Sequence, residues 1–541
     1  MRWLLAGTFS PAPSGRSFAV SGERFSDVIE GCRLSLTVEV ADHLGAAQTR
    51  AFELTFARPR DFRVEAVRAH ATLRALDEIA EALARPREPI TIDEAAKRVH
   101  ALVGDGVLLR ALDGRSEPTT EAASSIDTPA TPVSESNTDA AAPSGARDGV
   151  IDAIFSKAAV PEGTDAPLQA ARSGLDAFVG AMRGQGSKRP KPAAQTLDAA
   201  AIIRAGVERT ALAILAHPQV TALEQTWRGL RMVMAESPGH DELVVTALDV
   251  GADTLPTTLE QHLLAIGPDL RPDAVFVTHA ADDPSLLSAL ARVAARSQVV
   301  VVAGVTPSIT GFALRTNGWP EEPAPEPEPW AALRADAGSE WLVVSANPVV
   351  VVAEPLASGA RVVEASPAFA VAALLSGALA RSGTLVDAIG RRGAVRAPAA
   401  RDIDVRGVGA VTLPTRWPAA VEALAAAAER GLALLGHDRD QILLASAPTT
   451  AAAQPRQLPA QILLGRARRI VSHVRRGLRP DASARELERA LDEAAATFLP
   501  RGPRGSLHLQ PVSTDGKMQV DVRLGEDLAG SALALEIDFD A

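Results

Sequence analysis

In the middle of the chain, short apolar segments alternate with helix-like segments, and this alternation constrains the fold more than any other sequence feature. Apolar runs at residues 243–250, 274–278 and 298–303 indicate strands, and the apolar spacing at 259–266 and 284–296 indicates helices. Continuously apolar strands that alternate with helices are typical of a parallel sheet buried on both faces. We therefore predict an α/β (mixed α+β) fold, with a central, largely parallel sheet flanked by helices.

The second half of the chain continues with elements of the same kinds. Strands predicted at residues 341–345 and 349–353 would extend the sheet, since both are short apolar runs. Residues 367–380 and 418–435 are rich in alanine and are predicted to be helices. The other predicted elements are a short strand at 442–444 and a pair of helices at 462–478 and 484–499.

The end of the chain has the pattern of a small β-meander. Asp515-Gly516, a strong signal for a tight turn, separates apolar stretches at 507–512 and 518–524. The last segment, 532–539, alternates apolar residues with alanine and acidic residues, and its large apolar residues are Leu533, Leu535, Ile537 and Phe539. A terminal strand of this kind has an open edge that something must cover.

The predicted helix at 462–478 is strongly basic. Its arginines are Arg466, Arg468, Arg469, Arg475 and Arg476. A basic helix either presents a solvated face or meets an acidic partner, and the sequence leaves both interpretations open.

Composition divides the chain into four regions. Residues 1–113 are predicted to form an α+β module, because the patterns at 34–40, 52–56 and 64–83 indicate two strands and a helix. The next region contains few large apolar residues and much Ser, Thr, Ala and Pro, which is typical of a disordered linker. This linker is predicted at 114–196 and contains a short amphipathic helix at 150–155. An α/β body follows at 197–455 and a C-terminal region at 456–541.

Residues 197–234 form the longest helix-like stretch. His217-Pro218 should divide it into two helices, because a proline lacks the amide donor and pushes the preceding residue out of helical geometry. Trp227 is either a core residue or an anchor at a subunit contact, and core packing is the favoured interpretation.

The charge and residue content exclude several functional classes. A net charge of -11 and an aromatic content of 4% without any Tyr disfavour nucleic-acid binding, which needs clustered cations and stacking rings. The lone Cys32 rules out a disulfide within the chain. No apolar run is long enough for a signal-peptide core or a membrane span, so we expect a cytoplasmic protein without membrane insertion.

The sequence contains no recognisable catalytic motif. It lacks a phosphate-binding loop, a complete dinucleotide fingerprint, an HExxH zinc helix and a GxSxG nucleophile elbow. We therefore predict no enzyme activity and no catalytic, cofactor-binding or metal-binding residue. The alternative is a cytosolic α/β enzyme whose site is assembled only in three dimensions.

The region from residue 197 to 248 resembles the large subunit of the contractile sheath of type VI secretion systems, the TssC/VipB-like family. The resemblance is carried by His217-Pro218, Leu223-Glu224, Trp227-Arg228-Gly229-Leu230 and the strand that follows them. Residues 5–10 and 54–83 resemble the small, TssB-like sheath subunit, which is also found as an N-terminal extension of some large subunits.

This resemblance implies a structural protein with a sheath-subunit fold, which polymerises around an inner tube and contracts to drive effector delivery. The implied partners are other copies of the chain or a TssB-like small subunit, an Hcp-like tube protein, a baseplate and an AAA+ disassembly ATPase, for which the helix at 150–155 is the candidate contact. The terminal strand with Leu533, Leu535, Ile537 and Phe539 would be exchanged between neighbouring subunits, and the basic helix would meet acidic surfaces. A baseplate or adaptor scaffold of the same machine is the alternative.

Overall fold

The computed structural model describes residues 1–112, 194–498 and 507–538, except 24, 86–89, 238–241, 323, 357–358, 406–408, 480–481, 515–516 and 525–532. The chain forms two compact units. The larger comprises Met1–Ala41, Thr49–His70 and Ala211–Ala541, and the smaller comprises Asp42–Gln48 and Ala71–Thr210. The predicted amphipathic helix at 150–155 and the predicted linker up to residue 193 lie outside the described residues.

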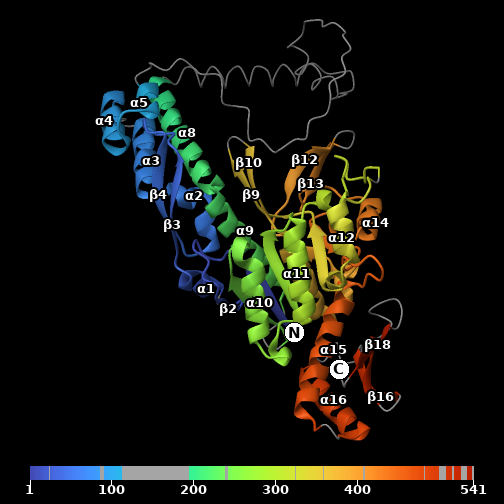
Figure 1. Cartoon of the computed structure of the whole chain (residues 1–541). Helices are drawn as coiled ribbons and strands as arrows, with labels where there is room; N and C mark the ends of the chain where they lie inside the picture. Colours follow the sequence, from blue (N-terminus) through green and yellow to red (C-terminus); the bar gives the residue numbers. More distant parts are fainter. Residues whose placement is uncertain are drawn as a thin grey trace, which may run out of the picture. The chain divides into compact units, whose positions relative to one another are not determined.

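A nine-stranded sheet forms the centre of the larger unit (Figure 1). In spatial order its strands are β11 (Val395–Arg396), β15 (Gln441–Leu444), β14 (Leu432–Asp438), β8 (Leu342–Ala346), β7 (Val300–Gly304), β6 (Ala274–Ala280), β1 (Arg2–Gly7), β5 (Val244–Asp249) and β2 (Ser17–Val20). The run from β14 to β5 is parallel, and antiparallel pairs complete both edges. The predicted central, largely parallel sheet is therefore confirmed.

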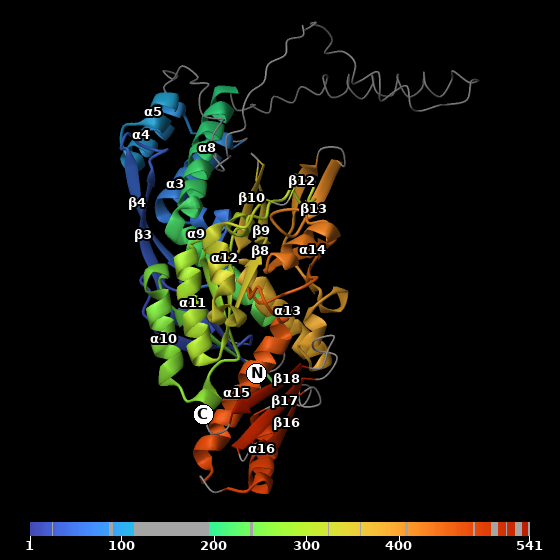
Figure 2. The same cartoon turned by 45° about the vertical axis from the view of Figure 1, so that its right-hand side comes forward.

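Helices cover both faces of this sheet. On one face, α9 (Pro218–Glu236) packs against α13 (Pro367–Ser382), and on the other α10 (Leu255–Ala265) packs against α11 (Pro284–Ser297) (Figures 1 and 2). Every residue of α13 up to Leu379 is buried, since its many small side chains let the helix lie close to its neighbours. Shorter helices of this unit are α1 (Phe25–Gly31), α2 (Val64–Arg68), α12 (Glu328–Ala335) and α14 (Val421–Glu429).

The N-terminal strand lies inside the large sheet. β1 pairs with β5 on one side and β6 on the other, and both of these strands come from the predicted body. β3 (Leu34–Ala41) and β4 (Thr49–Phe56) confirm the two strands predicted at 34–40 and 52–56, and they pair antiparallel. The large sheet therefore contains strands from both sides of residue 113, where the predicted N-terminal module ends.

Two predicted elements differ in the structure. The helix expected at 418–435 ends at Glu429, and residues 432–435 begin β14. Gly431 has a φ of 74°, which breaks the helix, and a four-residue apolar run fits a buried strand as well as a helix. The strand expected at 349–353 is β9 (Val349–Leu356), which pairs with β10 (Gly359–Ala365) in a separate hairpin instead of extending the sheet. A second hairpin consists of β12 (Arg401–Val405) and β13 (Gly409–Leu413).

The described part of the smaller unit is helical apart from Asp42–Gln48 and short connections between the helices. It contains α3 (Ala71–Ala84), α4 (Ile92–Val103), α5 (Val107–Leu112) and the start of α8 (Ala194–Ala216). Gly206 on α8 allows close approach to α5, because a Cβ there would lie 2.7 Å from Leu108 Cδ2. The helix predicted at 64–83 is therefore divided between the two units, as α2 and α3. Among the helices of the described residues, none has the length and apolar character needed to cross a bilayer.

Candidate functional site

The C-terminal region contains the two features that the sequence indicated as interaction surfaces. Its helices are α15 (Leu458–Gly477) and α16 (Ala484–Phe498), and its three-stranded sheet has the order β16 (Leu507–Thr514), β17 (Lys517–Leu524) and β18 (Leu533–Asp538). α15 lies next to the sheet in both views of the molecule (Figures 1 and 2). One hydrophobic cluster joins these elements, and its largest members are Leu463, Ile470, Val471, Val474, Leu487, Leu491 and Val520.

β18 is an edge strand. It pairs antiparallel with β17 from Leu524↔Leu533 to Gln519↔Asp538, and its other edge has no strand partner among the described residues. Leu533, Leu535 and Ile537 lie in β18, whereas Phe539 falls outside the described residues. The predicted hairpin and terminal strand are confirmed, and the open edge is the geometry that adding a strand from another chain requires.

Two arginines of the basic helix lie inside the molecule. Arg469 is 2% exposed, and its Nη2 donates to Asp273 Oδ1 at 2.6 Å while its Nη1 donates to the Gln298 carbonyl oxygen at 2.6 Å. Arg466 Nη1 donates to the other oxygen of the same carboxylate. These two side chains therefore hold α15 against the start of β6, which differs from the surface position predicted for them.

Asp273 is the acidic centre of this cluster. It is 1% exposed, and Oδ2 also accepts a hydrogen bond from the Arg2 backbone amide at 2.8 Å. Burial by itself would raise the pKa of this carboxyl, but the guanidinium groups of Arg466 and Arg469 outweigh burial and lower it. Burial lowers the pKa of Arg469 to about 10, so both partners are charged at neutral pH.

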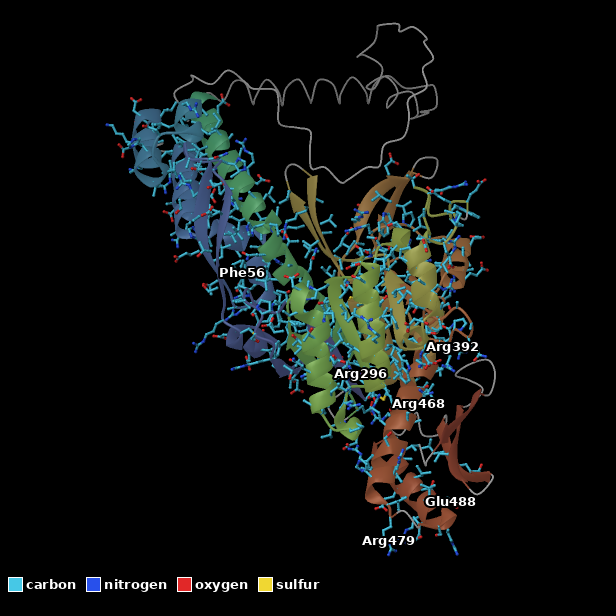
Figure 3. The ribbon with its side chains drawn as sticks, in the orientation of Figure 1. Phe56, Arg296, Arg392, Arg468, Arg479 and Glu488 are labelled. Atoms are coloured by element: carbon cyan, nitrogen blue, oxygen red, sulfur yellow. The ribbon has the colours of Figure 1, made fainter. Side chains whose placement is uncertain are left out.

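The remaining arginines of α15 face outward to different degrees. The Arg468 guanidinium lies over the Trp341 ring, 5.3 Å from its centroid, and Nη1 is 4.0 Å from Glu340 Oε1. Figure 3 labels Arg468 on this helix. Arg475 and Arg476, in the last turn, are exposed. The most exposed arginines of α15 therefore lie at the C-terminal end of the helix.

The motif that carried the family resemblance lies in the core. His217 precedes α9 and Pro218 is its first residue, so the predicted helix break is confirmed. Trp227 is fully buried, and its Nε1 donates to the Phe9 carbonyl oxygen at 3.1 Å. The rings of Phe9, Phe18 and Phe25 lie 5.6, 6.3 and 6.0 Å from the Trp227 ring. The favoured interpretation of Trp227 as a core residue is confirmed.

The other motif residues join α9 to its neighbours. A Cβ on Gly229 would lie 2.3 Å from Phe369 Cδ2, so glycine permits the close crossing of α9 and α13, and Leu230 is fully buried beside it. Arg228 Nε donates at 2.7 Å to Glu224, which is fully buried and also binds Arg361 of β10. The family motif therefore serves packing and internal ion pairing.

α/β proteins usually bind ligands at the carboxyl ends of their parallel strands, and the acid at one of these ends in this chain is occupied by hydrogen bonds within the chain. Asp249, at the end of β5, accepts hydrogen bonds from the backbone amides of Phe9, Ser10 and Ser14 at 2.8 to 3.1 Å, and from both serine hydroxyls. In the part of the chain that the structure describes, no three His, Cys, Asp or Glu side chains come together as metal ligands.

Sequence reasoning missed the buried acids Asp273 and Glu224 as organising residues. Asp273 pairs with two arginines of α15, and Glu224 pairs with Arg361 of β10 as well as with Arg228, four residues further along α9. The only sequence signal at Asp273 is a single acid directly before a predicted buried strand. Its partners on α15 lie 193 and 196 residues away, so no local pattern identifies them.

No protein-family model and no curated protein matches this sequence. Solved structures that resemble part of the chain include three sheath proteins. The helical sheath of the anti-feeding prophage in its contracted state is 14% identical, covers 55% of this chain and 77% of its own, and has a TM-score of 0.33. The contracted PVC sheath complex of an extracellular contractile injection system is 13% identical, with 56% and 76% coverage and a TM-score of 0.35. A sheath tail protein from Desulfitobacterium hafniense is 13% identical, with 52% and 59% coverage and a TM-score of 0.31. Similarities of this size assign neither a family nor a function to the chain.

Proposed function

We propose that this chain is a structural subunit of a bacterial contractile sheath of the type VI secretion kind, which polymerises around an inner tube and contracts to drive effector delivery. The observation that carries the proposal is the three-stranded C-terminal sheet, which ends the chain with an edge strand. Backbone groups on such an edge bind a strand of another chain without needing a particular side chain. The sequence motif at residues 217–230 supports the same proposal.

Strand exchange does mechanical work only if the exchanged strand is firmly joined to the subunit body. α15 supplies this connection, because its apolar face packs in the cluster with α16 and β17 while Arg466 and Arg469 bind Asp273 next to β6. A displacement of the C-terminal sheet would thus pull on the large sheet directly. Contraction would then be a change of packing between rigid subunits, driven by interfaces with two stable arrangements.

The N-terminal region would act as a small sheath subunit within the same chain. The support for this is that β1 and β2 belong to the same sheet as strands from the body, so one chain completes the fold. The remaining proposed partners are further copies of the chain, a tube protein, a baseplate and a disassembly ATPase, all in the cytoplasm. The proposal includes no enzymatic activity and no cofactor.

Electron microscopy of the purified full chain, expressed without any partner, tests the proposal. We expect rings or tubes, because small-subunit and large-subunit parts are present in one polypeptide. If tubes form only after a separate small subunit is added, the sheath proposal stands and the N-terminal proposal fails. A chain that stays monomeric with and without a small subunit and a tube protein contradicts the sheath proposal and favours an adaptor or an enzyme.

The exposed end of α15 yields a second test. Replacing Arg475 and Arg476 with Glu should reduce the fraction of protein in polymers at low salt, because the acidic surface of a neighbour would then be repelled. The difference from the unmodified chain should shrink in about 0.5 M salt, where charges are screened within a few ångströms. Sedimentation at both salt concentrations measures this, and an equal loss for Arg292→Glu, exposed on α11, would show that the effect is not specific to α15.

A further inference from the structure

A groove of about 660 Å³ lies beside the β9–β10 hairpin, away from the C-terminal region. One wall consists of five consecutive residues of β9, from Val351 to Pro355. Consecutive residues of a strand point to opposite faces, so a groove that touches five of them in a row follows the edge of the strand. The opposite wall is a single stripe of α9, made of Arg228, Arg231, Met232, Ala235 and Glu236.

This edge of β9 is free along most of its length. β9 pairs with β10 on one side only, and within the described residues its other side is hydrogen-bonded only at the start, where the Val350 amide donates to the Pro414 carbonyl oxygen at 2.9 Å. Beyond that point the groove lies where a neighbouring strand would otherwise pair with β9. Five residues of extended chain span about 17 Å. Pro355 has no amide hydrogen, so an added strand would pair with the backbone groups of β9 other than that donor.

The groove has a small excess of positive charge. Arg63, Arg228, Arg231 and Arg396 line it together with Glu65, Glu236 and Glu354. Two of these acids are paired with arginines from outside the groove, Glu236 with Arg381 at 3.6 Å and Glu354 with Arg361 at 3.3 Å. Two of the arginines are paired as well, Arg228 with Glu224 at 2.7 Å and Arg396 with Asp440 at 3.0 Å. Arg63 and Arg231 then face Glu65, which leaves a small excess of positive charge for an entering molecule.

One donor in the groove has no acceptor. Arg228 is 13% exposed, and its Nε binds Glu224, but its Nη2 is buried without a hydrogen-bond partner in the described structure. A buried donor left unpaired is unfavourable, and a carboxylate in the groove would pair with it once the guanidinium turns toward the groove. Arg231, one helical turn further along, is exposed.

We propose that this groove binds an extended, acidic segment of a partner protein, which adds as a strand to the free edge of β9. The backbone of the segment forms the ladder with β9, and its carboxylates contact Arg228 and Arg231. This mode of recognition explains why the free edge of β9 lies opposite Arg228 and Arg231 of α9, and it does not depend on assembly through β18.

Fluorescence anisotropy with labelled ten-residue peptides and the full chain tests this inference. The probe peptide alternates Glu with Val, and a matched peptide alternates Lys with Val. We expect the Glu peptide to bind at low salt and the Lys peptide to bind at least ten-fold more weakly. Equal binding of the two peptides would overturn the proposed charge recognition.

Two further variants separate strand addition from simple charge attraction. Arg231→Glu should weaken binding of the Glu peptide about ten-fold, whereas Arg292→Glu, exposed on α11 outside the groove, should leave it unchanged. A Glu peptide methylated on alternate backbone amides, along the edge that would face β9, should lose most of its affinity, because a methylated amide cannot donate to the strand. Undiminished binding of the methylated peptide, or of the unmodified peptide to Arg231→Glu, would overturn the proposal.

Discussion

Replacing residues 533–541 with a Gly/Ser sequence of equal length is expected to abolish polymer formation while the large sheet stays folded. β18 forms six residue pairs with β17, and an exchanged strand would form a comparable ladder with a neighbour. A Gly/Ser sequence keeps its backbone groups but forms strands poorly and lacks the apolar side chains of β18, so the ladder does not form stably. Each backbone hydrogen bond contributes about 1 kcal/mol net, so a ladder with about three fewer of them weakens association more than a hundred-fold. Sedimentation and electron microscopy measure the polymer.

Tryptophan fluorescence during urea unfolding provides the folding control for this variant. All six tryptophans belong to the larger unit, so their fluorescence reports on that unit alone. We expect little change in the unfolding midpoint, because none of the buried tryptophans is near the end of the chain. If the variant still forms polymers in normal amount, the strand-exchange hypothesis is wrong.

Asp273→Ala is expected to destabilise the larger unit by about 3–5 kcal/mol, the usual cost of leaving a buried charge without its partner. The variant would leave Arg469, which is 2% exposed, and Arg466 beside an apolar methyl group. The urea midpoint of tryptophan fluorescence measures the loss. Asp253→Ala removes the same charge from an exposed position and should change the midpoint little. Equal effects of the two variants would contradict a structural role for the Asp273 cluster.

The pH dependence of this difference follows from the lowered pKa of Asp273. A carboxyl whose pKa is lower in the folded than in the unfolded chain stabilises the fold above its ordinary value of 3.8, and this contribution is lost as pH falls through the folded value. The gap in stability between the unmodified chain and Asp273→Ala should therefore be full at pH 6 to 7 and should shrink below about pH 4. A gap that is unchanged at pH 3 would indicate that packing, not charge, is lost.

Much of the architecture was predictable because it depends on local patterns. The strands at β5, β6 and β7 and the helices between them follow from apolar runs and helical spacing alone. The hairpin of β16 and β17 was predictable because an Asp-Gly pair in the sequence separates two apolar stretches. The helix break at His217-Pro218 follows from the missing amide hydrogen of proline. Residues 432–435 escaped prediction because a short apolar run has no periodicity that distinguishes a buried strand from a helix.

The positions of the candidate interaction residues were less predictable. Sequence identified the arginines of α15 as a group, but it could not separate Arg469, buried against Asp273, from the exposed Arg476. It also could not identify the groove beside β9, because α9 and β9 are more than a hundred residues apart and meet only in the fold.

The sequence by itself determined the alternation of strands and helices, the buried tryptophan of α9 and the terminal edge strand, since each depends on the chemistry of neighbouring residues. Only the tertiary structure decided that β1 enters the middle of the large sheet, that Asp273 pairs with α15, and that the free edge of β9 faces arginines. These features result from contacts between distant segments, whose geometry is set by packing of the whole unit and leaves no periodic signal in the chain.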